Sequence, residues 1–326
     1  MIVLNEMPLT EVFIPTRLLH RDGQLREVER CLKPFLAGRA PENLFLVGPT
    51  GTGKTTVARW MLETHFHGRY VYVNCWKYRR SHQVLREVLL SFEVPVHGRE
   101  PTSELIRMLE KLLESKRLIV CLDEVDQLKD CDVLYVLARN ECCLILISND
   151  YRALSYLDPR IRSRLSLVEV EFPAYRYDEL VDILRDRVKL ALRPGSLDER
   201  FLRIIAAIAK GDARTGIEIL RRAARRAEDR GLRRITLNEI KEAIKEARRL
   251  RKSYLLSKLN EHQRVIYSIL EAKRRISSGE LYRKYCSKVK RPVTDRAFRN
   301  YMKKLVRLGL VAEQGYGRWR KYEVVI

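Results

Sequence analysis

The sequence lacks the cysteine patterns that indicate a zinc site or a disulfide framework. None of its seven cysteines stands in a C-x-x-C pair or at a zinc-like spacing from a histidine. Cys121, Cys142 and Cys143 lie in apolar runs, where a thiol behaves as a small hydrophobic group. The neighbouring histidines His65 and His67 are more typical of a solvated helix end than of a metal site. We therefore expect no structural metal.

Long apolar runs are missing as well. No signal peptide opens the chain, and its longest apolar runs fall far short of the length that spans a bilayer. No amphipathic segment with exposed aromatic residues indicates an anchor on a membrane surface. Asparagine and glutamine are scarce beside a charged fraction of 33%, a composition that favours a thermophilic source. We expect a cytoplasmic protein without a membrane partner.

Basic residues, in contrast, are in large excess. The chain has 64 Lys and Arg against 42 Asp and Glu, which gives a formal net charge of +22. Residues 255–326 hold 18 basic and 6 acidic residues, so +12 of this charge lies in the last 72 residues. Such an excess favours a polyanionic partner, and nucleic acid fits better than a membrane surface. The expected location is therefore the cytoplasm, in association with the nucleoid.

A phosphate-binding loop, G-P-T-G-T-G-K-T, occupies residues 48–55 between an apolar run at 44–47 and a helical pattern. Glycines let successive backbone N–H groups surround phosphate oxygens, and the following helix directs its positive end at them. Lys54 can reach the β- and γ-phosphates, and the hydroxyl of Thr55 suits Mg²⁺. We expect ATP or ADP with Mg²⁺ as cofactors. The predicted nucleotide-binding residues of the loop are Gly48, Pro49, Thr50, Gly51, Thr52, Gly53, Lys54, Thr55 and Thr56.

Polar residues follow two further apolar runs that are predicted to be buried strands. Asp123 and Glu124 end the run at 118–122, and Asn149 ends the run at 144–148. In these places Asp123 would hold Mg²⁺ through its water shell, while Glu124 would polarise the attacking water as a general base. Asn149 is placed to orient the same water. The plainer alternatives are a solvated acidic turn for Asp123 and Glu124 and an ordinary turn residue for Asn149. We predict Glu124, Asp123 and Asn149 as catalytic residues, and Thr55 and Asp123 as the magnesium site.

Arginines at two places suit contacts with the γ-phosphate. Asp158 and Pro159 predict a capped helix start, after which Arg160 and Arg164 share one helical face. An arginine there can act as a finger towards the nucleotide of a neighbouring molecule, although a basic surface helix is as good an explanation. Arg214 follows Gly211-Asp212-Ala213 at the start of another predicted helix. It would move with that helix and contact the γ-phosphate.

The order of predicted elements divides the chain into three parts. Strands are predicted at 44–47, 70–74, 118–122, 144–148 and 167–172, and helices at 55–64, 81–92 and 102–115. This alternation up to residue 173 predicts a parallel sheet covered on both faces. The next stretch has no strand signal and reads as helices at 177–191, 198–209, 213–230 and 236–249. The last part reads as helices at 260–272, 277–287 and 294–308, with two short strands around a turn at 315–317, a winged-helix pattern. The predicted domains are 1–173, 174–252 and 253–326.

The last predicted helix has an apolar face and a basic face. Phe298, Tyr301, Met302, Leu305 and Leu308 recur on the apolar face. A basic stripe opposite such a face suits the major groove of DNA, and a basic hairpin suits the minor groove or the backbone. A solvated basic face is the alternative. The predicted DNA-binding residues are Arg296, Arg299, Asn300, Lys303, Arg318, Arg320 and Lys321.

The ordered set of motifs resembles the archaeal replication initiators of the origin-recognition and cell-division-control type. This resemblance covers nearly the whole chain, and only the ordered combination is specific. It rests on the phosphate loop, H-R-D at 20–22, N-C-W-K-Y-R at 74–79, L-D-E-V-D at 122–126, I-S-N-D at 147–150, L-D-P-R at 157–160, G-D-A-R at 211–214 and the terminal winged-helix pattern. It implies an α/β AAA+ P-loop ATPase core with a parallel sheet, a helical lid and a C-terminal winged-helix DNA-binding domain.

The resemblance also implies roles for individual residues. Lys54 and Thr55 match the Walker A lysine and threonine, and Asp123 and Glu124 match Walker B. Asn149 matches sensor 1, Arg214 matches sensor 2, and either Arg164 or Arg160 matches the finger segment. A DNA-contacting insertion is implied near residues 79–100. The implied function is an ATP-dependent initiator with slow, regulatory hydrolysis, whose partners are double-stranded origin DNA, the replicative helicase that it helps to recruit or load, and paralogous initiators.

Two other functions stay open. One is a branch-migration motor with a winged helix, which would form hexamers and turn over ATP rapidly on DNA. The other is a transcription regulator gated by a nucleotide. Arg214 and the arginine-rich segment 160–164 argue against the regulator, because such switches often lack both features.

Overall fold

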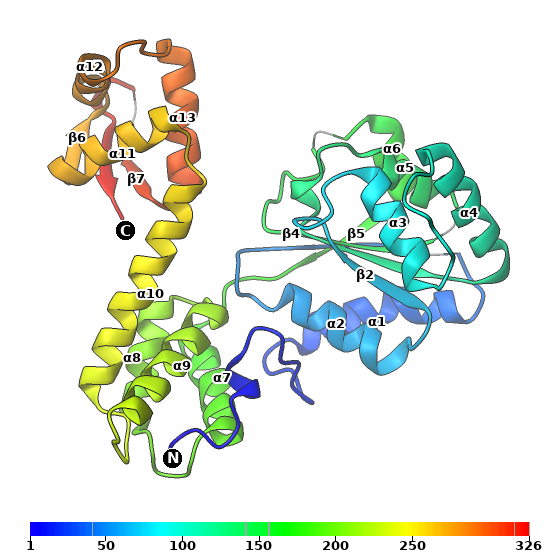
Figure 1. The fold of residues 1–326 in the computed structure, drawn as a ribbon, viewed down its shortest axis with the longest axis horizontal. Coiled ribbons are helices and arrows are strands. Elements are labelled where there is room, and N and C mark those ends of the chain that lie inside the picture. Colours follow the sequence, from blue (N-terminus) through cyan, green and yellow to red (C-terminus); the bar gives the residue numbers. More distant parts are fainter. Residues whose placement is uncertain (41, 141, 156, 316, 326) are drawn as a thin grey trace. The chain divides into compact units, whose positions relative to one another are not determined.

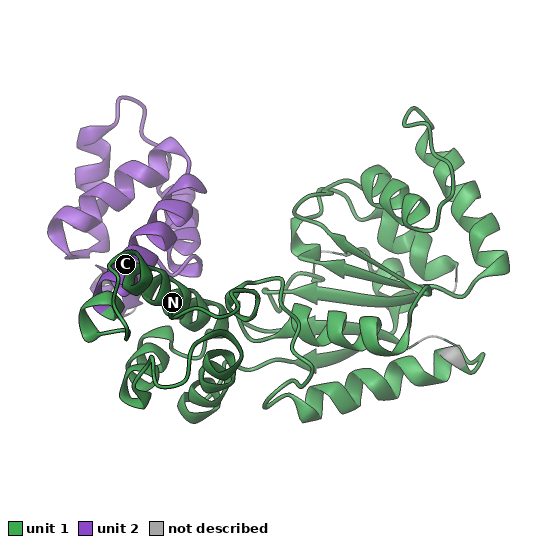
Figure 2. Cartoon of the chain, turned by 60° about the horizontal axis from the view of Figure 1, so that its bottom comes forward, with its two compact units in different colours: residues 1–240 green, residues 241–326 purple. Residues whose placement is uncertain are grey.

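The structure is a computed structural model of the 326-residue chain. It describes all residues except 41, 141, 156, 316 and 326, and it describes only the backbone of residues 36 and 318. The chain divides into two compact units, which we call the N-terminal unit (Met1–Ile240) and the C-terminal unit (Lys241–Ile326) (Figure 2).

A five-stranded parallel sheet forms the centre of the N-terminal unit (Figure 1). Every residue of β1, β3 and β4 is buried, which explains why these strands appear in the sequence as unbroken apolar runs. The five predicted strands are all present, in the spatial order β2-β3-β4-β1-β5. Their bounds are β1 (Asn43–Val47), β2 (Tyr70–Asn74), β3 (Ile119–Asp123), β4 (Cys143–Ser148) and β5 (Leu167–Glu171).

Helices cover both faces of this sheet. Leu44 and Leu46 belong to the core beneath α1 and α2, while Phe45 and Val47 belong to the core beneath α3, α4 and α5. The predicted helices α2, α3 and α4 are confirmed, whereas α1 and α5 had not been predicted; α1 contains a proline, and α5 is short. The bounds are α1 (Asp22–Leu36), α2 (Lys54–His65), α3 (Ser81–Ser91), α4 (Thr102–Ser115), α5 (Asp132–Arg139) and α6 (Pro159–Leu165).

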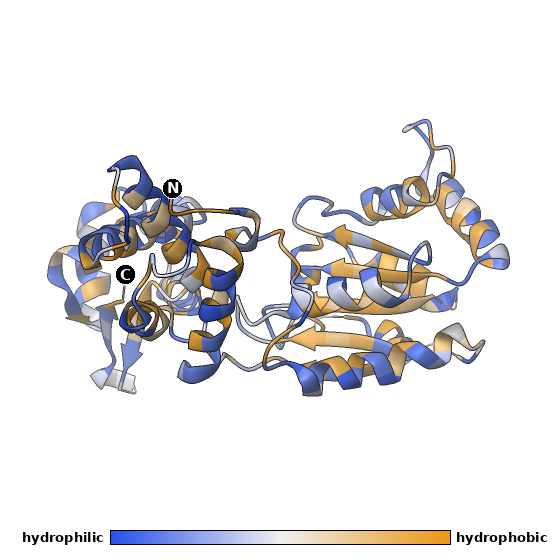
Figure 3. Ribbon diagram, turned by 90° about the horizontal axis from the view of Figure 1, so that it is seen from below, coloured by the Kyte–Doolittle hydropathy of each residue, from blue (hydrophilic) through white to orange (hydrophobic). Residues whose placement is uncertain are grey.

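Hydropathy follows these layers. In Figure 3 most of the sheet is apolar, and the helices around it alternate between apolar and polar residues. None of the helices in the described part of the chain has both the length and the apolar character needed to cross a membrane.

A group of helices, the lid, follows β5 in the N-terminal unit. It consists of α7 (Tyr177–Ala191), α8 (Glu199–Ala209), α9 (Ala213–Asp229) and the start of α10 (Leu237–Ser257). All four were predicted, but α10 is longer at its carboxyl end than the predicted 236–249. Residues 250–257 include no glycine or proline that would end the helix, so it continues to Ser257.

The first residues of the chain pack on the lid. The backbone N–H groups of Ile2 and Val3 donate to the carboxylate of Glu228, at 2.7 and 3.0 Å. Val3 also forms a β-bridge with Leu192, and a short 3-10 helix (Met7–Leu9) lies against α7 and α9. The predicted core, residues 1–173, therefore begins with a segment that contacts the lid.

The C-terminal unit has its own core of buried aromatic and aliphatic residues, among them Tyr267, Tyr285, Phe298 and Tyr322. Three helices pack with a three-stranded antiparallel sheet of order β6-β8-β7. The three predicted helices and the predicted hairpin are present, but the three-residue strand β6 is too short to show a pattern in the sequence. The bounds are α11 (Glu261–Lys273), β6 (Arg275–Ser277), α12 (Ser278–Lys288), α13 (Asp295–Arg307), β7 (Val311–Gln314) and β8 (Lys321–Val324). This element order is the one expected of a winged helix.

Candidate ATP site and DNA-binding face

The phosphate loop joins β1 to α2 and lies close to the lid. Gly51 and Gly53 have φ angles of 75° and 90°, in the left-handed region that favours glycine. A Cβ on Gly51 would lie 1.9 Å from an oxygen of Asp212, and one on Gly53 would lie 2.7 Å from the hydroxyl of Tyr175. The glycines thus allow both the turn of the loop and the close approach of residues that follow β5.

Lys54 is the first residue of α2, and its side chain points back into the loop. The residue is only 5% exposed, and its Nζ donates to the carbonyl oxygens of Gly48 and Pro49 at 2.8 and 2.7 Å. Burial lowers the pKa of Lys54 to about 8. A phosphate group in the loop would stabilise the charged form of this ammonium, since it brings negative charge to a cation with little access to water.

Thr55 and Asp123 come together as the sequence analysis expected. The Thr55 hydroxyl donates to Oδ2 of Asp123 at 2.7 Å, and the backbone N–H of Glu124 donates to Oδ1 at 2.8 Å. Within the described residues no cluster of three or more His, Cys, Asp or Glu side chains could hold a metal alone. Mg²⁺ commonly takes one or two protein oxygens and completes its shell with phosphate and water, so this pair fits a magnesium nucleotide.

The strand order places the remaining predicted catalytic residues at the same edge of the sheet. β4 lies between β3 and β1, so Glu124, Asn149 and the phosphate loop all follow the carboxyl ends of adjacent strands. Asn149 is exposed and Glu124 is half-buried. Glu124 has a φ of 55°, an uncommon value outside glycine that turns the chain sharply away from β3.

Arg214 lies in the first turn of α9, which contacts the phosphate loop. The N–H of Ala213 donates to the carbonyl of Gly51 at 3.1 Å, while Asp212 caps the helix by accepting from the N–H of Thr215. The guanidinium of Arg214 is half-exposed, with Nε 3.7 Å from the carboxylate of Glu11. Its charge is one of the causes that keep the pKa of Lys54 low, which places it near the loop.

Arg21 connects the loop to the segment that leads into the lid, a role that the sequence analysis did not assign. It is 4% exposed; its Nε donates to the carbonyl of Thr52 at 2.9 Å and its Nη2 to that of Pro173 at 2.8 Å. The guanidinium also stacks on the ring of Tyr175, 3.7 Å from its centre. Burial lowers the pKa of Arg21. The motif H-R-D had marked the residue, but only the fold shows its partners.

The predicted finger segment forms α6. Asp158 accepts from the N–H of Arg160 at 2.8 Å, which confirms the predicted helix cap. Arg160, Arg162 and Arg164 are all exposed, and Arg164 lies over the ring of Tyr135, 5.8 Å from its centre. Both candidate finger residues are therefore on the surface of the N-terminal unit.

The two faces predicted for α13 are present. Phe298, Met302 and Leu305 are buried in the core of the C-terminal unit. The opposite side exposes the predicted DNA-binding residues Arg296, Arg299, Asn300 and Lys303.

Not all of the basic side chains in this unit are equally available. Arg299 forms an ion pair with Asp295 on the same helix, and Arg320 pairs with Glu313 at 2.8 Å. Lys321 is exposed at the start of β8. The side chain of Arg318 lies outside the described part of the structure. We use the name α13 basic face for Arg296, Arg299, Asn300 and Lys303.

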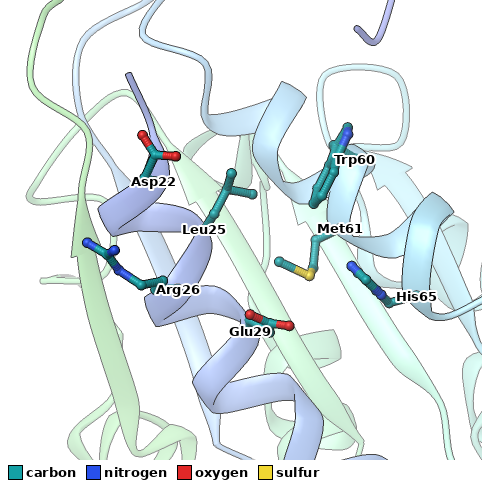
Figure 4. A pocket seen from close by; sticks show the side chains of 7 residues that line it. All are labelled: Asp22, Leu25, Arg26, Glu29, Trp60, Met61 and His65. Carbon is teal, nitrogen blue, oxygen red and sulfur yellow. The ribbon is translucent and has the colours of Figure 1, made fainter. Parts of the chain in front are cut away.

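A hollow of about 260 Å³ lies elsewhere on the N-terminal unit, where side chains of α1 and α2 face each other (Figure 4). Trp60 and Met61 line it from α2, and Leu25 from α1. It contains none of the predicted site residues.

Comparisons with known proteins agree with this geometry. A family model described as an AAA domain matches residues 39–151, and one described as a Cdc6 AAA+ ATPase-type lid domain matches residues 181–245. ORC1-type DNA replication protein 1 of Halobacterium salinarum is 35% identical over 298 residues, which cover 88% of this chain and 96% of that protein. ORC1-type DNA replication protein 1 of Sulfurisphaera tokodaii is 31% identical over 347 residues, which cover 97% and 87%.

Solved structures give the same result. The Orc1 protein of Aeropyrum pernix, in a structure of its complex with DNA, superposes with a TM-score of 0.78 at 31% identity, covering 100% of this chain and 94% of that one. The RuvB branch-migration motor of Thermotoga maritima reaches a TM-score of 0.56 at 17% identity over 96% and 95% of the chains, a likeness of fold alone. With an AAA+ core, a Cdc6-type lid and relatives that match over most of their length, the chain belongs to the family of ORC1-type DNA replication proteins and is an AAA+ ATPase.

Proposed function

We propose that the chain is an ATP-dependent replication initiator that binds duplex DNA at origins and helps to recruit or load the replicative helicase. The observation that carries the proposal is that one chain combines a complete phosphate site with a separate, exposed basic helix face. The likeness to the Orc1 protein of Aeropyrum pernix, which was solved with DNA, supports it over the full length of the chain.

In the proposed site, bound ATP and Mg²⁺ supply the transferable phosphoryl group and the metal that neutralises its charge. Lys54 binds the phosphates, while Thr55 and Asp123 hold the metal between the loop and β3. Glu124 acts as the general base and Asn149 orients the water. Arg214 reports the γ-phosphate to the lid through the start of α9.

We propose that hydrolysis is slow and regulatory. The candidate finger residues Arg160 and Arg164 are exposed on α6. A finger supplied by a neighbouring molecule is worth about 10³ to 10⁵ in rate in related phosphoryl transfers, so a site that lacks one turns over slowly. A paralogous initiator is the proposed source of that neighbour. The ATP-bound state would then persist long enough to act as a signal.

DNA would be held mainly by the C-terminal unit, which we propose to be a winged helix within the limits 253–326. The α13 basic face would enter the major groove, and Arg318, Arg320 and Lys321 would contact the backbone or the minor groove. Residues 79–100, which include α3, are the proposed second contact. The remaining proposed limits are 1–173 for the core and 174–252 for the lid, and the proposed location is the cytoplasm, on the nucleoid.

Mapping of the sites occupied by the protein in its source organism, compared with the positions where replication starts, tests the proposal. Coincidence of the two, lost in a variant with alanine at Arg299 and Lys303, is the expected result. Occupancy of promoters without replication starts would support a transcription regulator instead. A purified hexamer whose ATP turnover is fast and stimulated by DNA would support a branch-migration motor.

A further inference from the structure

Tyr72 on β2 reaches the carboxylate that ends β3. In the parallel register Tyr72 lies beside Cys121, so Asp123 is its diagonal neighbour on the same face of the sheet. Diagonal neighbours in a sheet are about 7–8 Å apart, a span that an aromatic side chain can bridge. The Tyr72 hydroxyl does bridge it, donating to Oδ2 of Asp123 at 2.6 Å.

The Asp123 carboxylate is thus fixed from three sides. Oδ2 accepts from Tyr72 and, at 2.7 Å, from the hydroxyl of Thr55 at the start of α2. Oδ1 accepts from the backbone N–H of Glu124 at 2.8 Å. Asp123 is only 5% exposed, and a buried charge of this kind needs such donors. Without Tyr72, one of the three would be lost and the carboxylate could turn about its side-chain bonds.

The surroundings of Tyr72 keep its hydroxyl a donor. Tyr72 is half-buried, and a phenol carries its proton at neutral pH, so its hydroxyl donates to the Asp123 carboxylate. On the other side the ring lies near the guanidinium of Arg59, 5.7 Å from the ring centre, and Arg59 is itself paired with Glu63 at 2.9 Å. The ring is therefore held in place, and its proton stays available to Asp123.

We propose that Tyr72 is a positioning residue of the magnesium site, which holds the Asp123 carboxylate in the orientation that meets the metal. The proposal rests on the proposed metal-binding role of Thr55 and Asp123. Tyr72 acts through Asp123 and has no part in the chemical step.

Loss of the Tyr72 hydroxyl should lower the affinity for Mg²⁺ more than the affinity for the nucleotide. Removing a partner that orients a metal ligand typically costs 10- to 100-fold in metal affinity, and we expect roughly tenfold for Tyr72→Phe. The concentration of Mg²⁺ that gives half-maximal hydrolysis should rise by this factor, while the rate at saturating Mg²⁺ stays close to that of the wild type. Affinity for ATP in the presence of a chelator should not change.

The experiment titrates Mg²⁺ into the full-length protein with a fluorescent ATP analogue and, in parallel, follows Mn²⁺ binding by electron paramagnetic resonance. Tyr70→Phe is the matched control, because Tyr70 lies two residues earlier on the same face of β2 and its hydroxyl makes no hydrogen bond within the described residues. Melting temperatures of both variants separate a metal effect from a general loss of stability. Asp123→Asn serves as the reference for loss of the site.

Three outcomes are decisive. The proposal is supported if the Mg²⁺ concentration at the midpoint of the titration rises in Tyr72→Phe but not in Tyr70→Phe. If Asp123→Asn loses its Mg²⁺ dependence while Tyr72→Phe matches Tyr70→Phe, the positioning role is wrong and the metal site stands. If Asp123→Asn keeps the wild-type midpoint, the metal site itself is wrong, and the role of Tyr72 is overturned with it.

Discussion

The two units of the chain use charge in opposite ways. The N-terminal unit has 40 basic and 34 acidic residues, whereas the much shorter C-terminal unit has 24 basic and 8 acidic residues. In the phosphate site the important charges are few, buried and tied to specific partners, as Lys54 and Asp123 show. On the α13 basic face they are exposed, and one of them, Arg299, pairs with Asp295 one turn earlier on the same helix.

The difference predicts how each site responds to substitution. A buried charge with fixed hydrogen bonds has no substitute nearby, so its loss should remove a function. An exposed charge acts together with its neighbours, and salt screens their combined attraction for a partner. Removal of one such charge should therefore lower the affinity only in part.

The largest effect is expected at Glu124. Glu124→Gln should keep ATP binding and lose hydrolysis, since a positioned general base contributes about 10² to 10⁴ in rate. Retention of radiolabelled ATP and release of phosphate measure the two properties separately. Lys54→Ala is the contrasting variant and should lose binding and hydrolysis together. Equal turnover in Glu124→Gln and the wild type would remove Glu124 from the mechanism.

The same contrast between buried and exposed residues explains what the sequence analysis could predict. Strands β1, β3 and β4 are buried on both faces, so their apolar runs and the polar residues after them are visible without a structure. The two faces of α13 are equally visible, because the spacing of Phe298, Met302 and Leu305 is a local property.

Contacts between distant residues were not predictable in this way. Tyr72 and Asp123 are 51 residues apart, and Arg21 and Pro173 are 152 apart. Tyr72 reads as an ordinary strand residue and Arg21 is marked only by the motif H-R-D, and only the fold brings them to their partners. The short elements α5 and β6 were missed for a different reason, because eight and three residues are too few to establish a period.

On the α13 basic face the expected effects are smaller and depend on salt. Arg299→Ala and Lys303→Ala should each cost about 1–3 kcal/mol of DNA affinity if they read bases, and should then also reduce the preference for origin sequence. If they contact phosphates, each should lower the slope of log affinity against log salt by about 0.9. Fluorescence anisotropy on origin-derived and random duplexes over a salt series distinguishes the two.

A matched control for this experiment is Arg200→Ala. Arg200 is an exposed, ion-paired arginine on α8 in the lid, where its partner is Asp198. It should leave both affinity and salt slope unchanged. DNA binding that does not depend on salt, or that is equally reduced by Arg200→Ala, would contradict a specific role of the α13 basic face.

The buried lysine of the phosphate loop should make nucleotide binding depend on pH. Burial lowers the pKa of Lys54 to about 8 in the free protein, and bound phosphates should raise it again by supplying negative charge. Because the charged form binds, affinity should be complete below this pKa and fall by about tenfold per pH unit above it. Calorimetry in buffers of different ionisation enthalpy should show proton uptake on binding.

Lys54→Arg is the control for this titration, since a guanidinium stays charged throughout the range. Whatever its absolute affinity, this variant should lose the pH dependence. If the wild-type protein binds the nucleotide with the same affinity from about pH 7 to 9.5, burial does not lower the pKa of Lys54 as expected.

The smallest effect on binding is expected at Arg214, which combines features of both units: it is half-exposed, yet it lies beside the buried loop. Arg214→Ala should leave ATP affinity nearly intact, and the loss of its exposed ion pair with Glu11 should cost only about 0.2–1 kcal/mol of stability. What should disappear is the difference in protease sensitivity between the ATP and ADP states.

Arg225→Ala is the matched control, because Arg225 on the same helix pairs with Glu6 of the same N-terminal segment. If Arg225→Ala keeps the difference in protease sensitivity and Arg214→Ala loses it, the place of Arg214 beside the phosphate loop is what makes it the sensor. If both variants keep the difference, Arg214 is not the sensor.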